Sequence, residues 1–405
     1  MMRSEKLEFE GSQGAMLAAR LDRPKAPPRG YALFAHCFSC SKETLAATRL
    51  ARELAGHGIA VLRFDFTGLG HSDGEFANTN FSSNIEDLLR AADHLREHYE
   101  APSILIGHSL GGAAVLVAAA KIPGIKAVVT IGAPADAAHV EKQFADDVDT
   151  IRQTGEARVQ LAGRPFTIRK QFLDDIAGQN VLEAAKSLKA ALLVAHAPRD
   201  ETVGIDNATR LFVAAKHPKS FLSLDDGDHL LSGAAHAAHA AKVIAAWAER
   251  YALNDPLPAA PASPPGHNSA LVQETGKGAY LSWASTGEAR FLVDEPEELG
   301  GFDAGPGPFQ LLSTALAACT TITLRMYTDR KNWALGRIST QVTHARSDAE
   351  DDRPARDVFT RAISVEGGVD DEQAAKLVEI AGKCPVHRTL ERSSRIDTAY
   401  AGDET

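Results

Sequence analysis

Short apolar segments alternate with amphipathic stretches along residues 31–224. Each segment is rich in Val, Ile, Leu or Phe, and each is followed by a turn and a stretch with helical periodicity. This alternation is typical of a mostly parallel β-sheet whose connecting helices cover both faces. We therefore predict a doubly wound α/β domain with strands at residues 31–36, 59–66, 103–108, 126–132, 191–196 and 220–224.

A proline-rich stretch, "NDPLPAAPASPPGHNS" at residues 254–269, interrupts this pattern. Its five prolines stand among small and polar residues, a composition that does not form a packed core and is typical of a semi-rigid linker. We therefore predict a first domain at residues 1–252, a linker at residues 253–270 and a second domain at residues 271–405.

The pattern after the linker is different. Residues 339–345 and 360–366 alternate between apolar and polar positions, as half-buried antiparallel strands do. Residues 308–327 predict a long helix that is apolar on nearly all sides, and residues 370–383 predict an amphipathic helix with acidic residues in its first turn. We expect an α+β second domain in which the apolar helix is buried in the core or in a dimer.

Charge and cysteine content exclude several classes of protein. The 405 residues carry a net charge of −10, which argues against a nucleic-acid or anionic-membrane partner because both require a basic surface. No apolar run reaches the roughly 18 residues of a membrane-spanning helix, and the N-terminus lacks the apolar region of a signal peptide. Four cysteines in so long a chain do not form a disulfide scaffold and indicate a reducing compartment. We expect a cytoplasmic protein without a bound metal.

The motif "GHSLGG" at residues 107–112 carries the clearest chemical signal. It fits the pattern G-x-S-x-G, with a predicted strand before it and a helical stretch after it. Glycines at these positions permit a sharp strand-to-helix turn that exposes the serine hydroxyl above the sheet. We therefore predict that Ser109 is a nucleophile.

A nucleophilic serine needs a histidine as base and a carboxylate that orients the histidine. Asp200 follows the predicted strand at residues 191–196, and His229 follows the last predicted strand. Both lie at carboxyl ends of strands, where open α/β sheets place their sites. Asp136 is the rival carboxylate, and strand order favours Asp200.

Other polar residues near these positions have simpler explanations. Asp225, Asp226 and Asp228 lie in the same loop as His229, where turn formation is their expected role. His236 and His239 have helical spacing, but neither has a carboxylate or cysteine nearby in the sequence to complete a metal site.

Residues 5–251 resemble the α/β-hydrolase family in three motifs together with Asp200 and His229; the motifs are "HCFSCSK", "FDFTGLGHSDG" and "GHSLGG". The resemblance implies that the backbone N–H groups of Phe38 and Leu110 form an oxyanion hole, in which each donor contributes about 3 kcal/mol. It also implies hydrolysis of an acyl substrate, without a cofactor. Most members have glycine where this chain has Cys37.

Cys37 and Cys40 form a C-x-x-C pair within "HCFSC". We interpret them chiefly as small packing residues that line the oxyanion turn. A redox or metal-binding role stays open, because C-x-x-C is a recognised signal, although no second pair of ligands accompanies it.

The connection between residues 136 and 191 is too long for a simple crossover between strands. It contains "VQLAGRPFTIRKQFLDDIAG" at residues 159–178, which we predict to form a small lid over Ser109.

Residues 275–401 resemble the OsmC/Ohr family of thiol-dependent peroxidases. The similarity lies in "DEPEELGGFDAGPGPFQLLSTALAACTTITLRMY" and "AGKCPVHRTL", which contain both cysteines of this domain. It implies that Cys319 is the peroxidatic cysteine, that Cys384 resolves it, and that a thiol reductant restores the pair. It also implies an intertwined homodimer with its sites at the subunit interface.

The family activates its thiolate with an arginine that a glutamate holds at the start of the cysteine helix. Arg290 is the best candidate for the arginine. Phe309 and Gln310 stand where the glutamate is expected, and Glu295 or Glu298 would have to replace it.

Three functional interpretations remain from the sequence, and the intact order Ser, Asp, His argues against one of them, a hydrophobic-ligand-binding protein whose two sites are relics. The leading one is a bifunctional enzyme, a serine hydrolase and a thiol peroxidase that reduces organic hydroperoxides. In the alternative, the enzyme is a serine hydrolase alone, and its second domain dimerises or binds a hydrophobic ligand.

Overall fold

The computed structural model describes residues 2–161, 163–255, 257–266, 268–347, 356–392 and 394–400. The chain forms two compact units, Met1–Ala259 and Ala260–Thr405. The boundary falls inside the proline-rich stretch, and each unit is described by itself.

An eight-stranded sheet forms the centre of the first unit, in the order β1-β2-β4-β3-β5-β6-β9-β10. All six predicted strands are present and pair in parallel. Their bounds are β3 (Gly30–Ala35), β4 (Ile59–Phe64), β5 (Ile104–His108), β6 (Ala127–Ile131), β9 (Ala191–His196) and β10 (Lys219–Ser223). The predicted doubly wound α/β fold is thereby confirmed.

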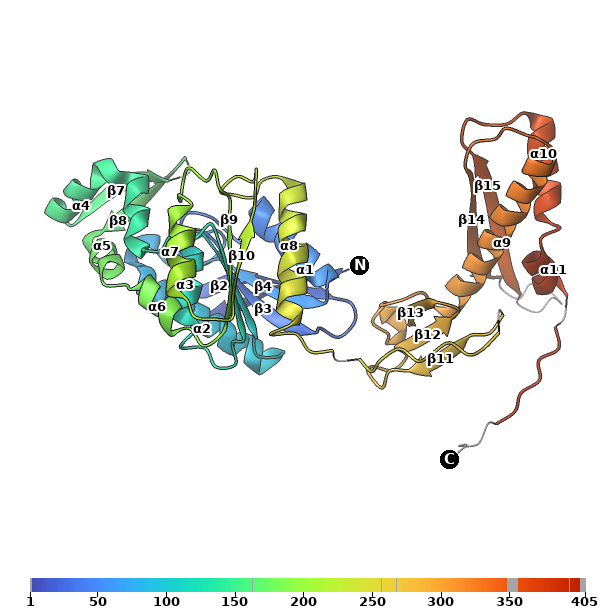
Figure 1. Ribbon diagram of the computed structural model, residues 1–405, viewed down its shortest axis with the longest axis horizontal. Helices are drawn as coiled ribbons and strands as arrows, with labels where there is room; N and C mark the ends of the chain where they lie inside the picture. Colours follow the sequence, from blue (N-terminus) through green and yellow to red (C-terminus); the bar gives the residue numbers. More distant parts are fainter. Residues whose placement is uncertain are drawn as a thin grey trace. The chain divides into compact units, whose positions relative to one another are not determined.

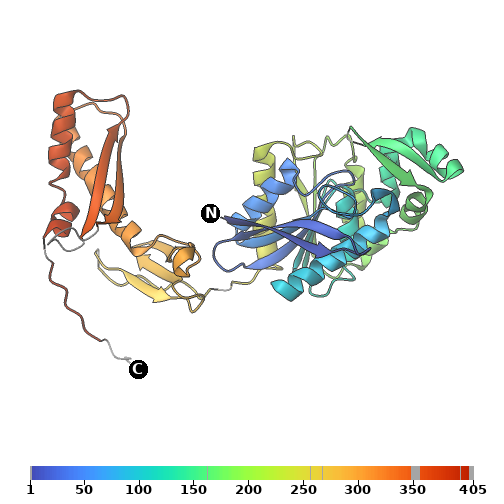
Figure 2. The same ribbon diagram turned by 180° about the vertical axis from the view of Figure 1, so that it is seen from behind.

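An N-terminal antiparallel hairpin, which the sequence analysis did not predict, extends this sheet at one edge. Its strands are β1 (Met2–Glu10) and β2 (Met16–Pro24), and β2 pairs with β4 (Figure 2). Charged residues alternate with apolar ones in β1, so the hairpin lacks the continuous apolar runs that marked the buried strands.

Helices cover both faces of the sheet (Figure 1). One face packs against α1 (Leu45–Gly56) and α8 (Ala234–Glu249). The other face packs against α2 (Phe81–His98), α3 (Leu110–Ala118), α6 (Val181–Ser187) and α7 (Asp206–Ala214). Two apolar cores therefore fix the sheet from both sides.

A small subdomain is inserted between β6 and α6, in the region where the lid was predicted (Figure 1). It consists of η2 (Ala137–Asp147), α4 (Val148–Thr154), β7 (Glu156–Leu161), β8 (Arg164–Arg169) and α5 (Lys170–Ala177). The strands β7 and β8 pair as an antiparallel hairpin. Phe144 and Phe172 from this insertion belong to the core that contains α2 and α3, so the insertion is packed onto the main body.

The second unit has the predicted α+β composition. A three-stranded sheet contains β11 (Leu271–Glu274), β12 (Ser282–Thr286) and β13 (Ala289–Val293). It is followed by η3 (Glu297–Leu299), α9 (Pro308–Arg330), the hairpin of β14 (Ile338–Arg346) and β15 (Asp357–Val365), α10 (Asp371–Ala381) and α11 (Pro385–Glu391). The predicted strands and helices correspond to β14, β15, α9 and α10, whereas the three-stranded sheet and α11 were not predicted.

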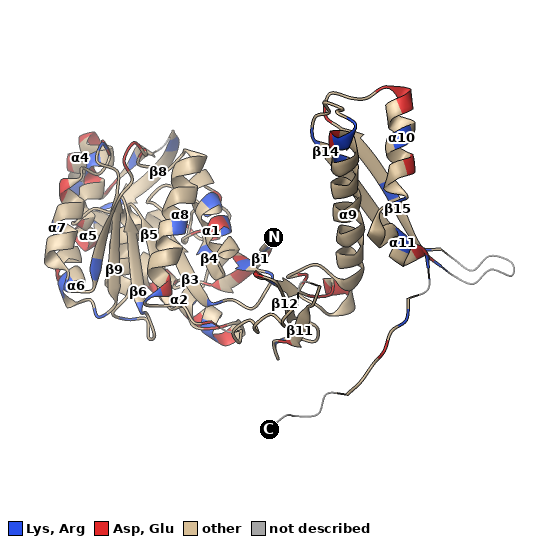
Figure 3. Ribbon diagram, turned by 45° about the vertical axis from the view of Figure 1, so that its right-hand side comes forward, with Lys and Arg blue, Asp and Glu red and all other residues tan. Residues whose placement is uncertain are grey.

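Helix α9 is not enclosed by its own unit, and the expectation of a helix buried in the core is wrong for a single copy. One narrow stripe is buried, made of Leu316, Thr320, Leu324 and Thr328. Ile322 and Met326 are each 60% exposed. Figure 3 shows few charged residues along the ribbon of α9 before its C-terminal part. Burial in a dimer therefore stays a prediction.

Within the part of the chain that the structure describes, no helix combines the length and the hydropathy needed to cross a bilayer.

Candidate functional site

Ser109 lies on a sharp turn between β5 and α3. Its backbone adopts φ 53° and ψ −125°, a conformation that residues other than glycine rarely adopt. The turn is tight because Gly107 and Gly111 contact backbone directly: a Cβ on Gly107 would overlap Gly111, and a Cβ on Gly111 would overlap the carbonyls of Ala35 and His36. The glycines of the motif therefore place Ser109 beside the end of β3.

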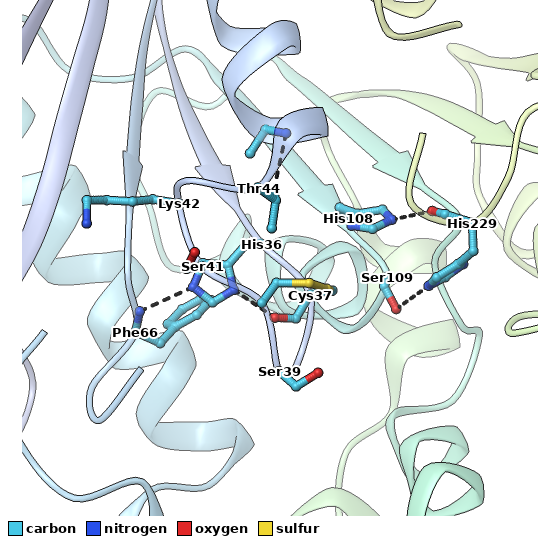
Figure 4. Close-up of a disulfide and its surroundings, with 12 residues drawn as sticks. His36, Cys37, Ser39, Ser41, Lys42, Thr44, Phe66, His108, Ser109 and His229 are labelled. Carbon is cyan, nitrogen blue, oxygen red and sulfur yellow. Dashed lines mark hydrogen bonds between the residues drawn. A yellow bond between two sulfur atoms is a disulfide. The ribbon is translucent and has the colours of Figure 1, made fainter. Parts of the chain in front are cut away.

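Ser109, His229 and Asp200 form one hydrogen-bonded chain. His229 Nε2 lies 3.1 Å from Ser109 Oγ, and His229 Nδ1 lies 2.7 Å from Asp200 Oδ2 (Figure 4 shows the serine–histidine contact). The other carboxylate oxygen of Asp200 accepts the backbone N–H groups of Thr202 and Val203, both at 2.9 Å. The structure thus brings together the nucleophile, base and acid predicted from strand order.

The surroundings of Asp200 keep its carboxylate ionised. Burial raises the pKa of Asp200, but hydrogen bonds from His229 and from the backbone of Val203 and Thr202 outweigh burial and hold the pKa below its usual value. An ionised Asp200 accepts the Nδ1–H of His229, which leaves Nε2 free to accept the serine proton.

His108, which the sequence analysis did not single out, supports the loop of His229. Its Nε2 lies 2.6 Å from the carbonyl oxygen of His229, and since a carbonyl only accepts, His108 donates. Burial, followed by the nearby charge of His229, lowers the pKa of His108 to about 4, so His108 is neutral near pH 7. Its place in "GHSLGG", next to the nucleophile, was the only signal in the sequence.

Gly132 is a second residue that the sequence analysis missed. It follows β6 with φ +54°, and a Cβ there would lie 3.2 Å from Asp200 Oδ2 and 3.3 Å from His229 Nδ1. The absence of a side chain lets the acid–base pair lie directly against the end of β6.

The two cysteines of the oxyanion turn are joined by a disulfide (Figure 4). This corrects their interpretation as simple packing residues. The backbone N–H of Cys40 donates to the carbonyl of Cys37 at 3.2 Å, and this turn brings the two Cα atoms to 5.2 Å, a separation that a disulfide can span. Phe38, the expected oxyanion donor, lies inside the closed loop.

Other carboxylates considered in the sequence analysis bind different partners. Asp136 caps η2 by accepting the N–H of Ala138. Asp228 accepts two hydrogen bonds from Ser232, and Asp226 pairs with His236 at 3.1 Å. Among the described residues, no group of three or more His, Cys, Asp and Glu side chains could hold a metal ion.

In the second unit, Cys384 lies close to the residue that follows Cys319. Cys384 is fully buried, its Sγ accepts the N–H of His387 at 3.3 Å, and it lies 3.7 Å from Thr320 Oγ1. Both cysteines are free, and Cys319 is partly exposed on α9. The residue that follows Cys319 therefore contacts Cys384, and the two cysteines are not bonded to each other.

Arg361, which the sequence analysis did not single out, is a cation close to the buried Cys384, whereas Arg290 lies in its own hairpin. Arg361 on β15 donates to Thr320 Oγ1 and to the carbonyl of Ala381, both at 2.9 Å. Arg290 is exposed and donates to the carbonyls of Gly287 and Ala289 in its own hairpin. Arg361 lies in the strand predicted at residues 360–366, but nothing in the sequence indicated that its side chain would contact Thr320 on α9.

Phe309 and Gln310 take structural positions at the start of α9. The ring of Phe309 stacks on His344 at 4.2 Å. Gln310 Oε1 accepts the N–H of Gly307 at 2.9 Å and closes the helix N-terminus. Glu295 Oε2 lies 3.7 Å from the position that a Cβ on Gly307 would take, close to the start of α9.

Known proteins match the two units separately. The family model described as serine aminopeptidase, S33, matches residues 26–167, and the model described as OsmC-like protein matches residues 301–399. The crystal structure of an esterase domain from Rhodothermus marinus is 48% identical, with a TM-score of 0.51, and covers 62% of this chain and 99% of that chain.

Two curated relatives show similarity over shorter stretches. Monoacylglycerol lipase of Mycolicibacterium smegmatis is 25% identical over 224 residues, which are 49% of this chain and 79% of the lipase. Mitochondrial palmitoyl-protein thioesterase ABHD10 of Mus musculus is 31% identical over 154 residues, which are 36% of this chain and 50% of the thioesterase.

The position of Gly132 gives a test of the acid–base pair. We expect Gly132→Ala to lower kcat on a p-nitrophenyl ester by about tenfold or more, with little change in KM, because the added Cβ displaces Asp200 and His229. Gly124→Ala is the matched control: Gly124 also has positive φ, but a Cβ there meets no atom within 4 Å. Equal kcat values for the two variants would contradict the role of Gly132.

Proposed function

Because this chain is a fusion of an α/β-hydrolase domain with an OsmC-like domain, we propose that it is a serine hydrolase that cleaves an ester or thioester. The observation that carries the proposal is the hydrogen-bonded chain from Ser109 through His229 to Asp200. The similar proteins described above, an esterase domain, a lipase and a thioesterase, support this class of substrate.

In the proposed reaction, Ser109 Oγ attacks the acyl carbonyl while His229 Nε2 accepts the serine proton. Asp200 holds the histidine in the required tautomer and stabilises its charged form. The backbone N–H groups of Phe38 and Leu110 receive the developing oxyanion. His229 then gives the proton to the leaving alcohol or thiol, and a water molecule activated by His229 releases the acid and restores Ser109.

Aromatic side chains surround the oxyanion turn and favour an apolar acyl group. The ring of Phe38 packs against Phe76, Phe144 and Phe172, with centroids 5.5, 6.4 and 5.0 Å away. Phe144 and Phe172 belong to the inserted subdomain, which we propose acts as the lid of the acyl site.

A fluorophosphonate probe tests this function. We expect it to label the wild type at Ser109, and we expect Ser109→Ala to lose both the label and the hydrolase activity, with kcat lowered by about 10⁴-fold or more. Ser187→Ala, at an exposed serine of α6, is the control and keeps both. Labelling of Ser109→Ala at an unchanged rate would exclude Ser109 as the nucleophile.

We further propose a second activity, reduction of organic hydroperoxides by Cys319. The Cys319 thiolate attacks the O–O bond, releases an alcohol and becomes a sulfenic acid. The Cys384 thiol then condenses with the sulfenic acid, which releases water and forms a disulfide that a thiol reductant reduces again. Both cysteines lie within residues 301–399, which match the OsmC-like model, and Cys384 lies against Thr320.

A different role for the second unit has its own support. Phe309 replaces the expected glutamate, and Arg290 bonds only its own hairpin. An open cavity of about 470 Å³ between α9 and β14 has apolar side chains in its lining (Phe309, Ala317 and Val342) together with polar ones (Gln310, Ser313, Thr314, Thr343 and His344). These features favour dimerisation or binding of a hydrophobic ligand as the alternative to peroxidase chemistry.

Peroxide titration decides between these roles. We expect one equivalent of an organic hydroperoxide to form a Cys319–Cys384 disulfide, detected by mass spectrometry, more readily than hydrogen peroxide does. Cys384→Ser should instead retain a sulfenic acid at Cys319 that dimedone traps. Absence of both products would leave the second unit with dimerisation or ligand binding only.

We also propose a homodimer formed through α9. Its charge-poor surface, with Ile322 and Met326 exposed, supports a second copy as the covering partner.

Light scattering tests the dimer. We expect the mass of a dimer for the wild type and of a monomer for Ile322→Glu, because a charge would be buried in the interface. Val378→Glu on α10 is the control, since Val378 is similarly exposed but lies on another helix. A monomeric wild type would refute the proposal.

A further inference from the structure

The disulfide Cys37–Cys40 encloses the residue whose backbone is expected to bind the oxyanion. The closed loop contains only Phe38 and Ser39 between its cysteines, and it lies between β3 and α1. A small cavity of about 10 Å³ has Cys37, Phe38 and Leu110 in its lining, so the loop also lies beside the first residue of α3. Any change in the backbone of this loop therefore moves a proposed oxyanion donor.

Both ends of the loop are fixed by buried groups. On one side, His36 Nδ1 donates to the carbonyl of Cys37 at 2.7 Å. On the other side, the backbone and the ammonium group of Lys42 both bond the buried carboxylate of Asp65. Between these anchors, residues 37–40 are closed on themselves by the disulfide and by one turn hydrogen bond at 3.2 Å, from Cys40 N–H to Cys37 O.

The same loop is connected to the inserted subdomain. Arg164 on β8 donates to the carbonyl of Ser39. The ring of Phe38 packs on Phe172 of α5, with centroids 5.0 Å apart. The disulfide loop is therefore the point where the oxyanion turn and the proposed lid meet.

The two cysteines differ in exposure. Cys37 is 7% exposed, whereas Cys40 is only partly buried. An external thiolate therefore reaches Cys40 first, and Cys37 is the leaving sulfur.

We propose that Cys37–Cys40 is a reversible redox site at which thiol–disulfide exchange sets the activity of the hydrolase. This inference rests on the proposed serine hydrolase function. The disulfide form holds Phe38 N–H in position for the oxyanion, and the dithiol form leaves residues 37–40 free to move between their anchors.

The exchange balances with a dithiol as the reductant. One thiolate of the dithiol attacks Cys40 Sγ, a mixed disulfide forms, and Cys37 leaves as a thiolate that takes up a proton. The second thiol of the dithiol then attacks the first sulfur of the same dithiol, which is bonded to Cys40, and releases Cys40 as a thiol. Two electrons and two protons pass to the protein, and the dithiol leaves as a disulfide. Re-oxidation by a disulfide runs the same steps in reverse.

The expected effect is on kcat more than on KM. Complete loss of one oxyanion donor lowers kcat by about 10²–10³-fold. Reduction loosens the donor without removing it, so we expect kcat to fall by about tenfold in the reduced form.

The test uses the full chain and a p-nitrophenyl ester. The rate is measured on the oxidised protein, after treatment with dithiothreitol, and after re-oxidation with oxidised glutathione; alkylation and mass spectrometry follow Cys37 and Cys40. We expect the loss of kcat and its recovery to track labelling of these two thiols. The ratio of oxidised to reduced rates should persist in Cys319→Ser, which shows that the second unit is not the sensor.

The double variant Cys37→Ser, Cys40→Ser provides an independent measurement. We expect its kcat to match that of the reduced wild type and to be insensitive to dithiothreitol. Should it fail to fold, the reduction and re-oxidation of the wild type still carry the test, because they require no substitution. Equal kcat in both redox states of the wild type overturns this inference alone. No hydrolysis in either state, together with no fluorophosphonate labelling, overturns the proposed function and this inference with it.

Discussion

The site in the first unit depends on direct backbone contact around the N-terminus of α3. Gly107 and Gly111 leave no side chain between β5, α3 and the end of β3, so the nucleophile and the oxyanion turn lie side by side. Gly132 also leaves room, at the end of β6, because the side chains of Asp200 and His229 lie against the space that a Cβ would fill. The arrangement of Ser109, His229 and Asp200 thus depends on close backbone packing at the carboxyl ends of β3, β5 and β6. Ser109 accepts a strained φ of 53° as a consequence.

Parallel strands explain why Ser109, Asp200 and His229 could be predicted from the sequence. Their carboxyl ends meet at one edge of the sheet, so residues that follow separate strands converge in space. The alternation of apolar segments marked those strands, because β3, β4, β5, β6 and β9 are buried on both faces, and only β10 at the sheet edge is partly exposed. The β1–β2 hairpin lacks this property, and its charged, alternating sequence gave no comparable signal.

The pattern of apolar and polar positions could not identify residues whose role depends on a contact with a residue distant in the sequence. His108 matters because its ring meets the carbonyl of residue 229, and Arg361 matters because its guanidinium meets Thr320, 41 residues earlier. The disulfide is a similar case: the C-x-x-C spacing allowed packing, metal binding or oxidation, and the structure joins the two cysteines by a disulfide across a turn that brings their Cα atoms to 5.2 Å.

The buried ion pairs beside β4 explain which parts of the backbone near the oxyanion turn are held in place and which can move. Arg63 pairs with Asp22, and Lys42 pairs with Asp65, with all four side chains almost fully buried. Removing one partner of such a pair leaves a buried charge uncompensated, at a cost of about 3–5 kcal/mol, so the backbone on either side is effectively fixed. The loop at residues 37–40 is attached to this rigid frame through Lys42, yet its own four residues depend on a covalent bond that a thiol can open. A rigid frame around one reversible bond confines any redox change to the oxyanion turn and to the lid residues in contact with it.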